Sequence, residues 1–127
     1  MILVDTSVWV DHLRSGNAAL AGLLESGMVM THPFVIGEIA LGDLRQREAV
    51  RTALSNLPRA TLAADAEVLD FIERHRFWGR GIGYIDAHLL AAVRLSAGSA
   101  LWTNDKRLRT VAAELELAMP VPRRPHR

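Results

Sequence analysis

The chain has 127 residues, of which 50% are hydrophobic, and its formal net charge is +1. This length suits a single domain with one sizeable core, and the sequence lacks the run of roughly 18 apolar residues that would cross a bilayer. It contains no cysteine, which excludes a disulfide scaffold and a thiolate metal site. The strand-like N-terminus lacks a basic leader, so we expect no signal peptide and a cytoplasmic protein without membrane contact.

The first predicted strand, Ile2–Val4, ends at Asp5. Its residues show no polar alternation, which is typical of a strand that is covered on both faces in a parallel α/β sheet. Thr6 or Ser7 is predicted to N-cap a helix that ends near Arg14. Because the ligands of such sheets bind beyond the carboxyl ends of the strands, Asp5 is expected at a functional site.

Helical periodicity, turn residues and caps predict the elements that follow. The helix over residues 84–97 is nearly apolar all round and is therefore expected to be central and buried. Further helices are expected over residues 18–26, 33–44, 47–56, 65–77 and 106–115, and short strands over residues 28–30, 59–62, 100–102 and 117–119.

The strand over residues 100–102 repeats the pattern of the first strand, because it too is followed by polar residues, a carboxylate at Asp105 and a helix. If the two strands are parallel and adjacent, Asp5 and Asp105 converge. We assign residues 1–119 to one domain. Residues 120–127 are basic and rich in proline, and we expect them to form a disordered tail.

Two further acids lie on helix faces where a carboxylate is unexpected. Asp86 opens an apolar face of its helix. Glu38 falls on the apolar stripe of its own helix, which is formed by Phe34, Val35 and Leu41. A carboxylate in either place needs a partner.

Each of the four acids has a plain structural alternative, which is a helix cap, a place at the positive end of a helix dipole or a partner arginine. Taken together, however, four carboxylates without a matching lysine or histidine would repel one another unless a hard divalent cation lies between them. Ligation by oxygen alone favours Mg²⁺ or Mn²⁺ over Zn²⁺.

These residues resemble the four acidic motifs of the PIN-domain ribonucleases, and most closely those of the small VapC toxins of toxin–antitoxin pairs. The segments that carry the resemblance are Asp5-Thr6-Ser7, Val35-Ile36-Gly37-Glu38-Ile39, Gly83-Tyr84-Ile85-Asp86-Ala87 and Thr103-Asn104-Asp105-Lys106-Arg107-Leu108. They occur in order and cover almost the whole chain, up to Met119. The resemblance implies an α/β fold, a three-layer αβα sandwich on a mostly parallel sheet of about four or five strands.

The same resemblance implies Mg²⁺- or Mn²⁺-dependent endonucleolytic cleavage of a structured RNA, a homodimer and inhibition by a VapB-like antitoxin. Asp5 and Asp86 are expected to bind the metal directly. Glu38 and Asp105 complete the site directly or through water, and which of them acts on the attacking water stays open. Four neighbours are expected either to hold the carboxylates and contact phosphate or to cap helices: Thr6, Ser7, Thr103 and Asn104.

A segment that mixes arginines with aromatic rings precedes Asp86. Its arginines are candidates for RNA contact, and its rings are either stacking partners or core residues. The three candidate phosphate-binding residues are Arg74, Arg76 and Arg80.

The first two helices are richly apolar around Trp9 and Leu13, so a groove between them is a candidate site for an amphipathic antitoxin segment, although core packing is the alternative. Two other functions stay open. A Mg²⁺-dependent phosphatase or phosphotransferase of the haloacid-dehalogenase type would require a second aspartate at position 7, where this chain has Ser7. A non-catalytic binding module would leave the helix carboxylates without an explanation.

Overall fold

The computed structural model describes residues 1–120, and in this part of the chain three short strands form one parallel sheet. The strand order is β2 (Val29–Met30), β1 (Ile2–Val4), β3 (Ala100–Trp102). The first strand lies in the centre, and Val4 pairs with Trp102 across the β1–β3 ladder. The prediction that the strands before Asp5 and Asp105 are parallel neighbours is therefore confirmed.

The two remaining predicted strands contribute only isolated bridges, so the sheet has three strands and not four or five. Residue Thr31 pairs with Arg59, and Leu101 pairs with Ala118, in both cases in parallel. The pairing at the second bridge consists of Leu101 N–H donating to Leu117 O at 2.7 Å and Met119 N–H donating to Leu101 O at 2.8 Å. Each segment follows the sheet edge for one residue before it turns away.

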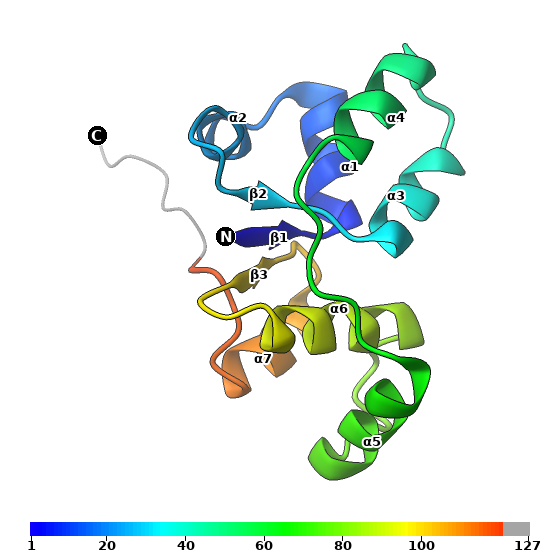
Figure 1. Cartoon of the computed structure of the whole chain (residues 1–127), viewed down its shortest axis with the longest axis vertical. Helices are drawn as coiled ribbons and strands as arrows, with labels where there is room; N and C mark the ends of the chain where they lie inside the picture. Colours follow the sequence, from blue (N-terminus) through cyan, green and yellow to red (C-terminus); the bar gives the residue numbers. More distant parts are fainter. Residues whose placement is uncertain (121–127) are drawn as a thin grey trace.

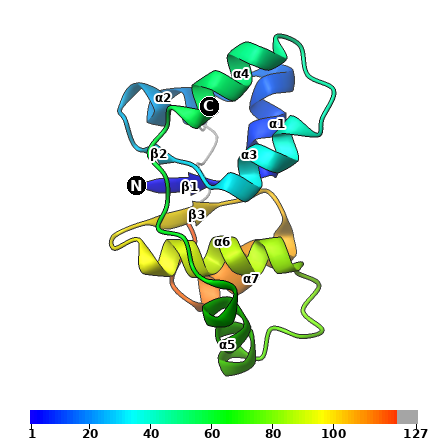
Figure 2. The same cartoon turned by 45° about the vertical axis from the view of Figure 1, so that its right-hand side comes forward.

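Helices cover both faces of the sheet, as Figures 1 and 2 show from two directions. One layer contains α1 (Thr6–Ser15), α2 (Ala18–Glu25), α3 (Pro33–Ala40) and α4 (Arg47–Ser55). The opposite layer contains α5 (Asp65–His75), α6 (Tyr84–Leu95) and α7 (Lys106–Glu114). The arrangement is the expected three-layer αβα sandwich.

The core is built where the central strand meets the helix that the sequence predicts to be buried. Leu3 and Val4 of β1 are both 0% exposed, as a strand covered on both faces requires. In α6 every residue from Ala87 to Val93 is buried. This packing holds the N-terminal end of α6 beside the carboxyl ends of β1 and β3, which is the edge where the acids were expected.

No helix within residues 1–120 combines the length and apolar content needed to span a bilayer. The tail expected over residues 120–127 lies, apart from Pro120, outside the described residues.

Candidate active site

Asp5 lies at the carboxyl end of β1, where the chain turns directly into α1. It is 7% exposed, and its backbone N–H donates to Trp102 O at 2.9 Å, so the neighbouring strand fixes its position. Asp5 is the N-cap residue of α1, although its carboxylate makes no capping hydrogen bond. The predicted N-cap, Thr6 or Ser7, is therefore wrong by one or two residues, because the strand passes into the helix without an intervening turn.

Two hydroxyl groups hold the Asp5 carboxylate. Thr103 Oγ1 donates to Asp5 Oδ2 at 2.7 Å, and Ser7 Oγ donates to the same oxygen at 3.0 Å. The two hydroxyls in turn accept backbone N–H groups at 3.0 Å, Thr103 from Asp105 and Ser7 from Asn104. Thr103 is only 2% exposed, and hydrogen bonds shielded from water in this way are electrostatically strong. This network fixes the carboxylate in one orientation.

The four polar residues expected around the acids thus differ in what they do. Ser7 and Thr103 hold a carboxylate through their side chains, whereas Asn104 joins the network only through its backbone N–H. Thr6 Oγ1 is buried and has no hydrogen-bond partner among residues 1–120.

Glu38 lies on α3 with its side chain exposed, and it makes no hydrogen bond to any described residue. Partial withdrawal from water raises the pKa of its carboxyl group, and the negative charges of Asp5 and Asp86 raise it further. The stripe predicted for this helix is wrong. Val35 is buried, but Leu41 is 90% exposed because the helix ends at Ala40.

Asp86 lies in the first turn of α6, half-buried. Its Oδ2 accepts the backbone N–H of Gly83 at 2.9 Å. Desolvation is the largest effect on the Asp86 carboxyl and raises its pKa, the bond from Gly83 opposes that shift, and the charges of Asp5 and Asp105 add to it. Asp86 is therefore held in place by a cap while it is repelled by the neighbouring acids.

Asp105 is the N-cap of α7. The structural alternative for this acid, a helix cap, therefore accounts for one of its two carboxylate oxygens. Oδ1 accepts the backbone N–H groups of Arg107 at 2.9 Å and Leu108 at 3.1 Å. Its other oxygen accepts no hydrogen bond from the described residues, so the carboxylate keeps one oxygen for another ligand.

The mutual repulsion that shifts the pKa values links all four acids. Asp5 acts on Glu38 and on Asp86, and Asp105 acts on Asp86. Within residues 1–120, however, no three acidic or histidine side chains already stand close enough to hold one metal ion together. The four acids offer only oxygen ligands, and this donor chemistry fits a hard divalent cation such as Mg²⁺ or Mn²⁺.

Two of the three candidate RNA-binding arginines are occupied by acids of their own chain. Arg80 makes a paired contact with Glu114, with Nη1–Oε1 at 3.0 Å and Nη2–Oε2 at 2.7 Å. Glu114 ends α7, whereas Asp105 begins it, and the two are about 13 Å apart at 1.5 Å per residue. Arg80 is therefore tied to the end of α7 that lies away from the carboxylates.

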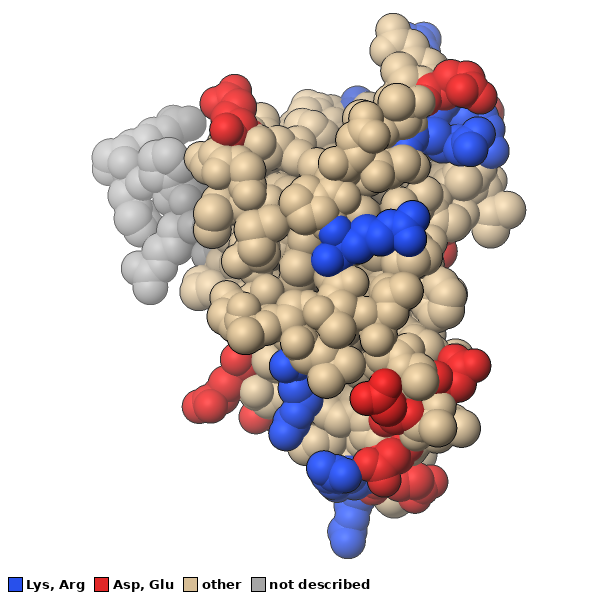
Figure 3. Space-filling view, in the orientation of Figure 1, with Lys and Arg blue, Asp and Glu red and all other residues tan. Residues whose placement is uncertain are grey.

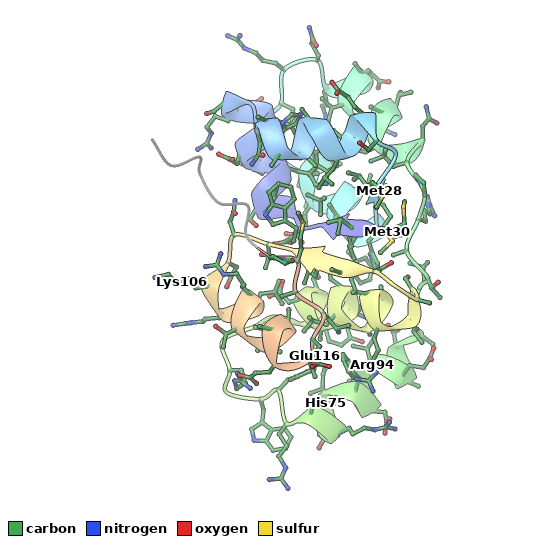
Figure 4. All side chains as sticks on the ribbon, turned by 90° about the vertical axis from the view of Figure 1, so that its left-hand side faces the viewer. Met28, Met30, His75, Arg94, Lys106 and Glu116 are labelled. Atoms are coloured by element: carbon green, nitrogen blue, oxygen red, sulfur yellow. The ribbon has the colours of Figure 1, made fainter. Side chains whose placement is uncertain are left out.

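Arg74 pairs with Asp70 at 2.7 Å and lines a shallow pocket of about 210 Å³ between α5 and α6. His75 and Arg94, which share this pocket, lie well away from Lys106 at the start of α7 (Figure 4). Arg76 is the helix C-cap and has a left-handed backbone with φ of 55°. Contact of these three arginines with RNA stays a prediction.

Sequence reasoning gave no role to Gly83, whose N–H holds the carboxylate of Asp86. A glycine followed three residues later by an acid just before an apolar run is a recognisable capping pattern, and it was the available signal. The partners of Asp5 were harder to assign, because Thr103 is 98 residues away along the chain.

Comparison with known proteins agrees with this geometry. The family model described as "PIN domain" matches residues 2–114. Two curated proteins, both called "Ribonuclease VapC32", from Mycobacterium tuberculosis strains CDC 1551 / Oshkosh and ATCC 25618 / H37Rv, are each 48% identical to this chain over 119 residues, which is 94% of this chain and 96% of theirs. These findings support neither the phosphatase nor the non-catalytic alternative. The resemblance to the PIN-domain, VapC-type ribonucleases is confirmed, and the chain belongs to the PIN-domain family.

Proposed function

We propose that this protein is a Mg²⁺- or Mn²⁺-dependent endoribonuclease, the toxin of a toxin–antitoxin pair that cleaves a structured RNA and so arrests translation. The observation that carries the proposal is that Asp5 and Asp105 follow two adjacent parallel strands, with Asp86 in the first turn of the helix packed beside them; the pKa values of Glu38 and Asp86, each raised in part by Asp5, agree with this arrangement. Acids that repel one another at the ligand-binding edge of a parallel sheet, without a neutralising side chain, suit a divalent cation and a phosphodiester substrate.

Asp5 and Asp86 would hold the metal directly, and Asp105 would complete the site with the oxygen that its helix cap leaves free. When bound, the metal supplies a water that is nucleophilic near neutral pH and a positive charge for the phosphate oxygens. The hydroxyls of Thr103 and Ser7 donate to Oδ2 of Asp5 and so would hold its carboxylate in position for the metal.

Glu38 is assigned as the base that accepts a proton from the attacking water at its carboxylate. Unlike the other three acids, it is not engaged in a hydrogen bond with the described chain, and its raised pKa brings it closer to the operating pH, which makes it a better general base. Asp105 is less suited to that role because one of its oxygens caps α7.

The partner would be a VapB-like antitoxin, and an apolar groove of about 300 Å³ supports a place for it. The groove was expected between the first two helices, but α4 forms much of its wall. Leu13 at its edge is 37% exposed. The lining residues are Trp9, His12, Leu13, Leu24, Ala49, Val50, Ala53, Leu54 and Leu57. An amphipathic helical segment would fill such a groove with its apolar side chains.

We propose a homodimer in the cytoplasm as the working form, which rests on the family resemblance alone.

The proposed metal-dependent cleavage of RNA has a direct test. Purified protein is incubated with a structured RNA, with Mg²⁺, with Mn²⁺ or with chelator, and Asp5→Asn serves as the inactive control. We expect cleavage only with wild-type protein and metal. Cleavage that persists in chelator, or in Asp5→Asn, would rule out the metal mechanism.

A further inference from the structure

Arg107 is the second residue of α7, and its side chain crosses the loop that leads to Asp86. Its backbone N–H donates to Asp105 Oδ1 at 2.9 Å. Its side chain packs on Gly81, where an added Cβ would stand 2.5 Å from Arg107 Cδ and 2.7 Å from Arg107 Nη1. The residue therefore connects the segment of one acid with the segment of another.

Two features favour glycine at position 81. Its φ is 78°, a left-handed conformation that side chains rarely adopt, and the space where a Cβ would lie is taken by Arg107. Gly79 has a similar φ of 72°, but nothing lies within 4 Å of its Cβ position. The bare backbone of Gly81 thus forms a seat for the arginine, which we call the Gly81 seat.

The guanidinium of Arg107 has no polar partner among the described residues. It makes no ion pair and no side-chain hydrogen bond there, whereas Arg51, Arg74 and Arg80 each contact an acid. The charges that move the pKa of Asp86 are those of Asp5 and Asp105. No arginine contributes to the pKa shifts of Glu38 or Asp86, so the guanidinium of Arg107, which lies against Gly81, does not neutralise these carboxylates.

Helix stability does not explain a cation at this place. The positive end of the helix dipole lies at the start of α7, where Lys106 and Arg107 are each unfavourable by about 0.3–1 kcal/mol. Both side chains are exposed, and Lys106 points outward (Figure 4). The helix dipole therefore does not account for Arg107 at this position.

We propose that Arg107, held on the Gly81 seat, binds an RNA phosphate next to the one that is cleaved. This inference rests on the proposed function. A guanidinium offers a planar fork that matches two phosphate oxygens. Arg107 starts at the helix end that Asp105 caps and reaches the loop that leads to Asp86, which suits a phosphate next to the one that is cleaved. On the face in Figure 3, cations and acids are interspersed without a broad basic field.

The test compares two pairs of variants that differ only in the contact with the Gly81 seat. Arg107→Gln removes the proposed contact, and Arg109→Gln removes the same charge two residues further along α7, where the side chain lines a different surface pocket with Glu116 and Met119. Gly81→Ala displaces Arg107, and Gly79→Ala introduces similar backbone strain without touching it. Each is measured in wild-type protein for cleavage and in an Asp86→Asn background for binding of fluorescein-labelled oligouridylate at several salt concentrations.

We expect Arg107→Gln and Gly81→Ala each to weaken binding by about tenfold and to reduce the salt slope by about 0.7. Arg109→Gln and Gly79→Ala should leave both quantities unchanged, and thermal melts should show that all four variants are folded. The double variant Arg107→Gln/Gly81→Ala should be no weaker than Arg107→Gln alone.

Two failures can be told apart. If the wild type cleaves RNA with metal but Arg107→Gln binds oligouridylate with an unchanged affinity and slope, the role of Arg107 is overturned and the proposed function stands. If the wild type neither cleaves nor binds RNA, both proposals are overturned. Equal losses in Arg107→Gln and Arg109→Gln would also overturn the specific contact, because they would show a general charge effect.

Discussion

A single buried hydroxyl, that of Thr103, links two of the four acids. It donates to Asp5 Oδ2 at 2.7 Å and accepts the N–H of Asp105 at 3.0 Å. We expect Thr103→Val to destabilise the fold by about 1–3 kcal/mol, since it removes a hydrogen bond from the buried carboxylate of Asp5, and to reduce cleavage by roughly 10- to 100-fold. Thr103→Ser keeps the hydroxyl and should restore most of both. Thermal melts and initial cleavage rates check this, and a serine variant as defective as the valine variant would show that the methyl group matters instead.

His32 gives the fold a pH dependence that does not involve the acids. Burial lowers the pKa of His32 to about 4, and the charges of His88 and Arg59 lower it further. The folded protein therefore keeps this ring neutral, while the unfolded chain protonates it near its usual pKa of 6.5. Its contribution to stability is complete above about pH 6.5 and is lost as the pH falls towards 4, by at most about 1.4 kcal/mol per pH unit.

The matched variant is His32→Asn, because the ring Nδ1 accepts Phe34 N–H at 3.0 Å and the asparagine oxygen can do the same. The unfolding free energy of the wild type should fall more steeply between pH 7 and 5 than that of His32→Asn. Glu38 and Asp86, whose pKa values are raised, act in the opposite direction and are common to both proteins. Parallel stability curves for the two would contradict the assignment to His32.

At the scale of elements, the local sequence pattern predicted the strands at the edge of the sheet that carries the acids. It did not predict the direction in which the helix side chains point. The apolar runs before Asp5 and Asp105 identify two strands whose parallel pairing follows from fold class. The face of Glu38 was misassigned because the helix ends four residues earlier than its pattern suggested, at Ala40. Helix length, and with it the buried face, depends on packing that the sequence does not display.

The arginines likewise show that the sequence alone does not reveal tertiary contacts. Arg80 is paired with Glu114, 34 residues away along the chain, and no local rule connects the two. The quoted motif around Asp105 contains Arg107, but the contact with Gly81 arises only from the fold. Residue types and spacing therefore predicted which carboxylates follow the two strands, while the partners of charged side chains required the tertiary structure.

The groove beside α4 gives an element-scale prediction. Val50 lines it and is half-buried, whereas Thr52 on the same helix is exposed and does not line it. Val50→Glu would place a charge in the apolar groove and should weaken inhibition by the proposed VapB-like antitoxin, without reducing RNA cleavage. Thr52→Glu adds the same charge and should be inhibited like the wild type. If the antitoxin inhibits Val50→Glu equally well, the groove is not its site.

At the scale of the whole molecule, the candidate site exists only where the three layers meet. Asp5 and Asp105 follow adjacent strands, Glu38 comes from the helical layer on one face, and Asp86 comes from the layer on the other (Figure 2). A metal bound among them would bridge the layers and stabilise the folded state over the unfolded chain. Without metal, the same acids oppose one another and reduce its stability.

The most direct test of this account is a set of thermal melts of the wild type and Asp86→Asn, each with chelator and with Mn²⁺. Asparagine keeps an acceptor for Gly83 N–H and removes one negative charge, so the metal-free variant should be more stable than the wild type, on the order of 1 kcal/mol. Mn²⁺ should raise the melting temperature of the wild type, by the equivalent of about 2.7 kcal/mol at a hundred times its dissociation constant. It should leave Asp86→Asn unchanged, while Asp43→Asn, which alters an exposed loop acid, should respond like the wild type. A destabilised Asp86→Asn whose response to Mn²⁺ equals that of the wild type would contradict the carboxylate cluster as a metal site.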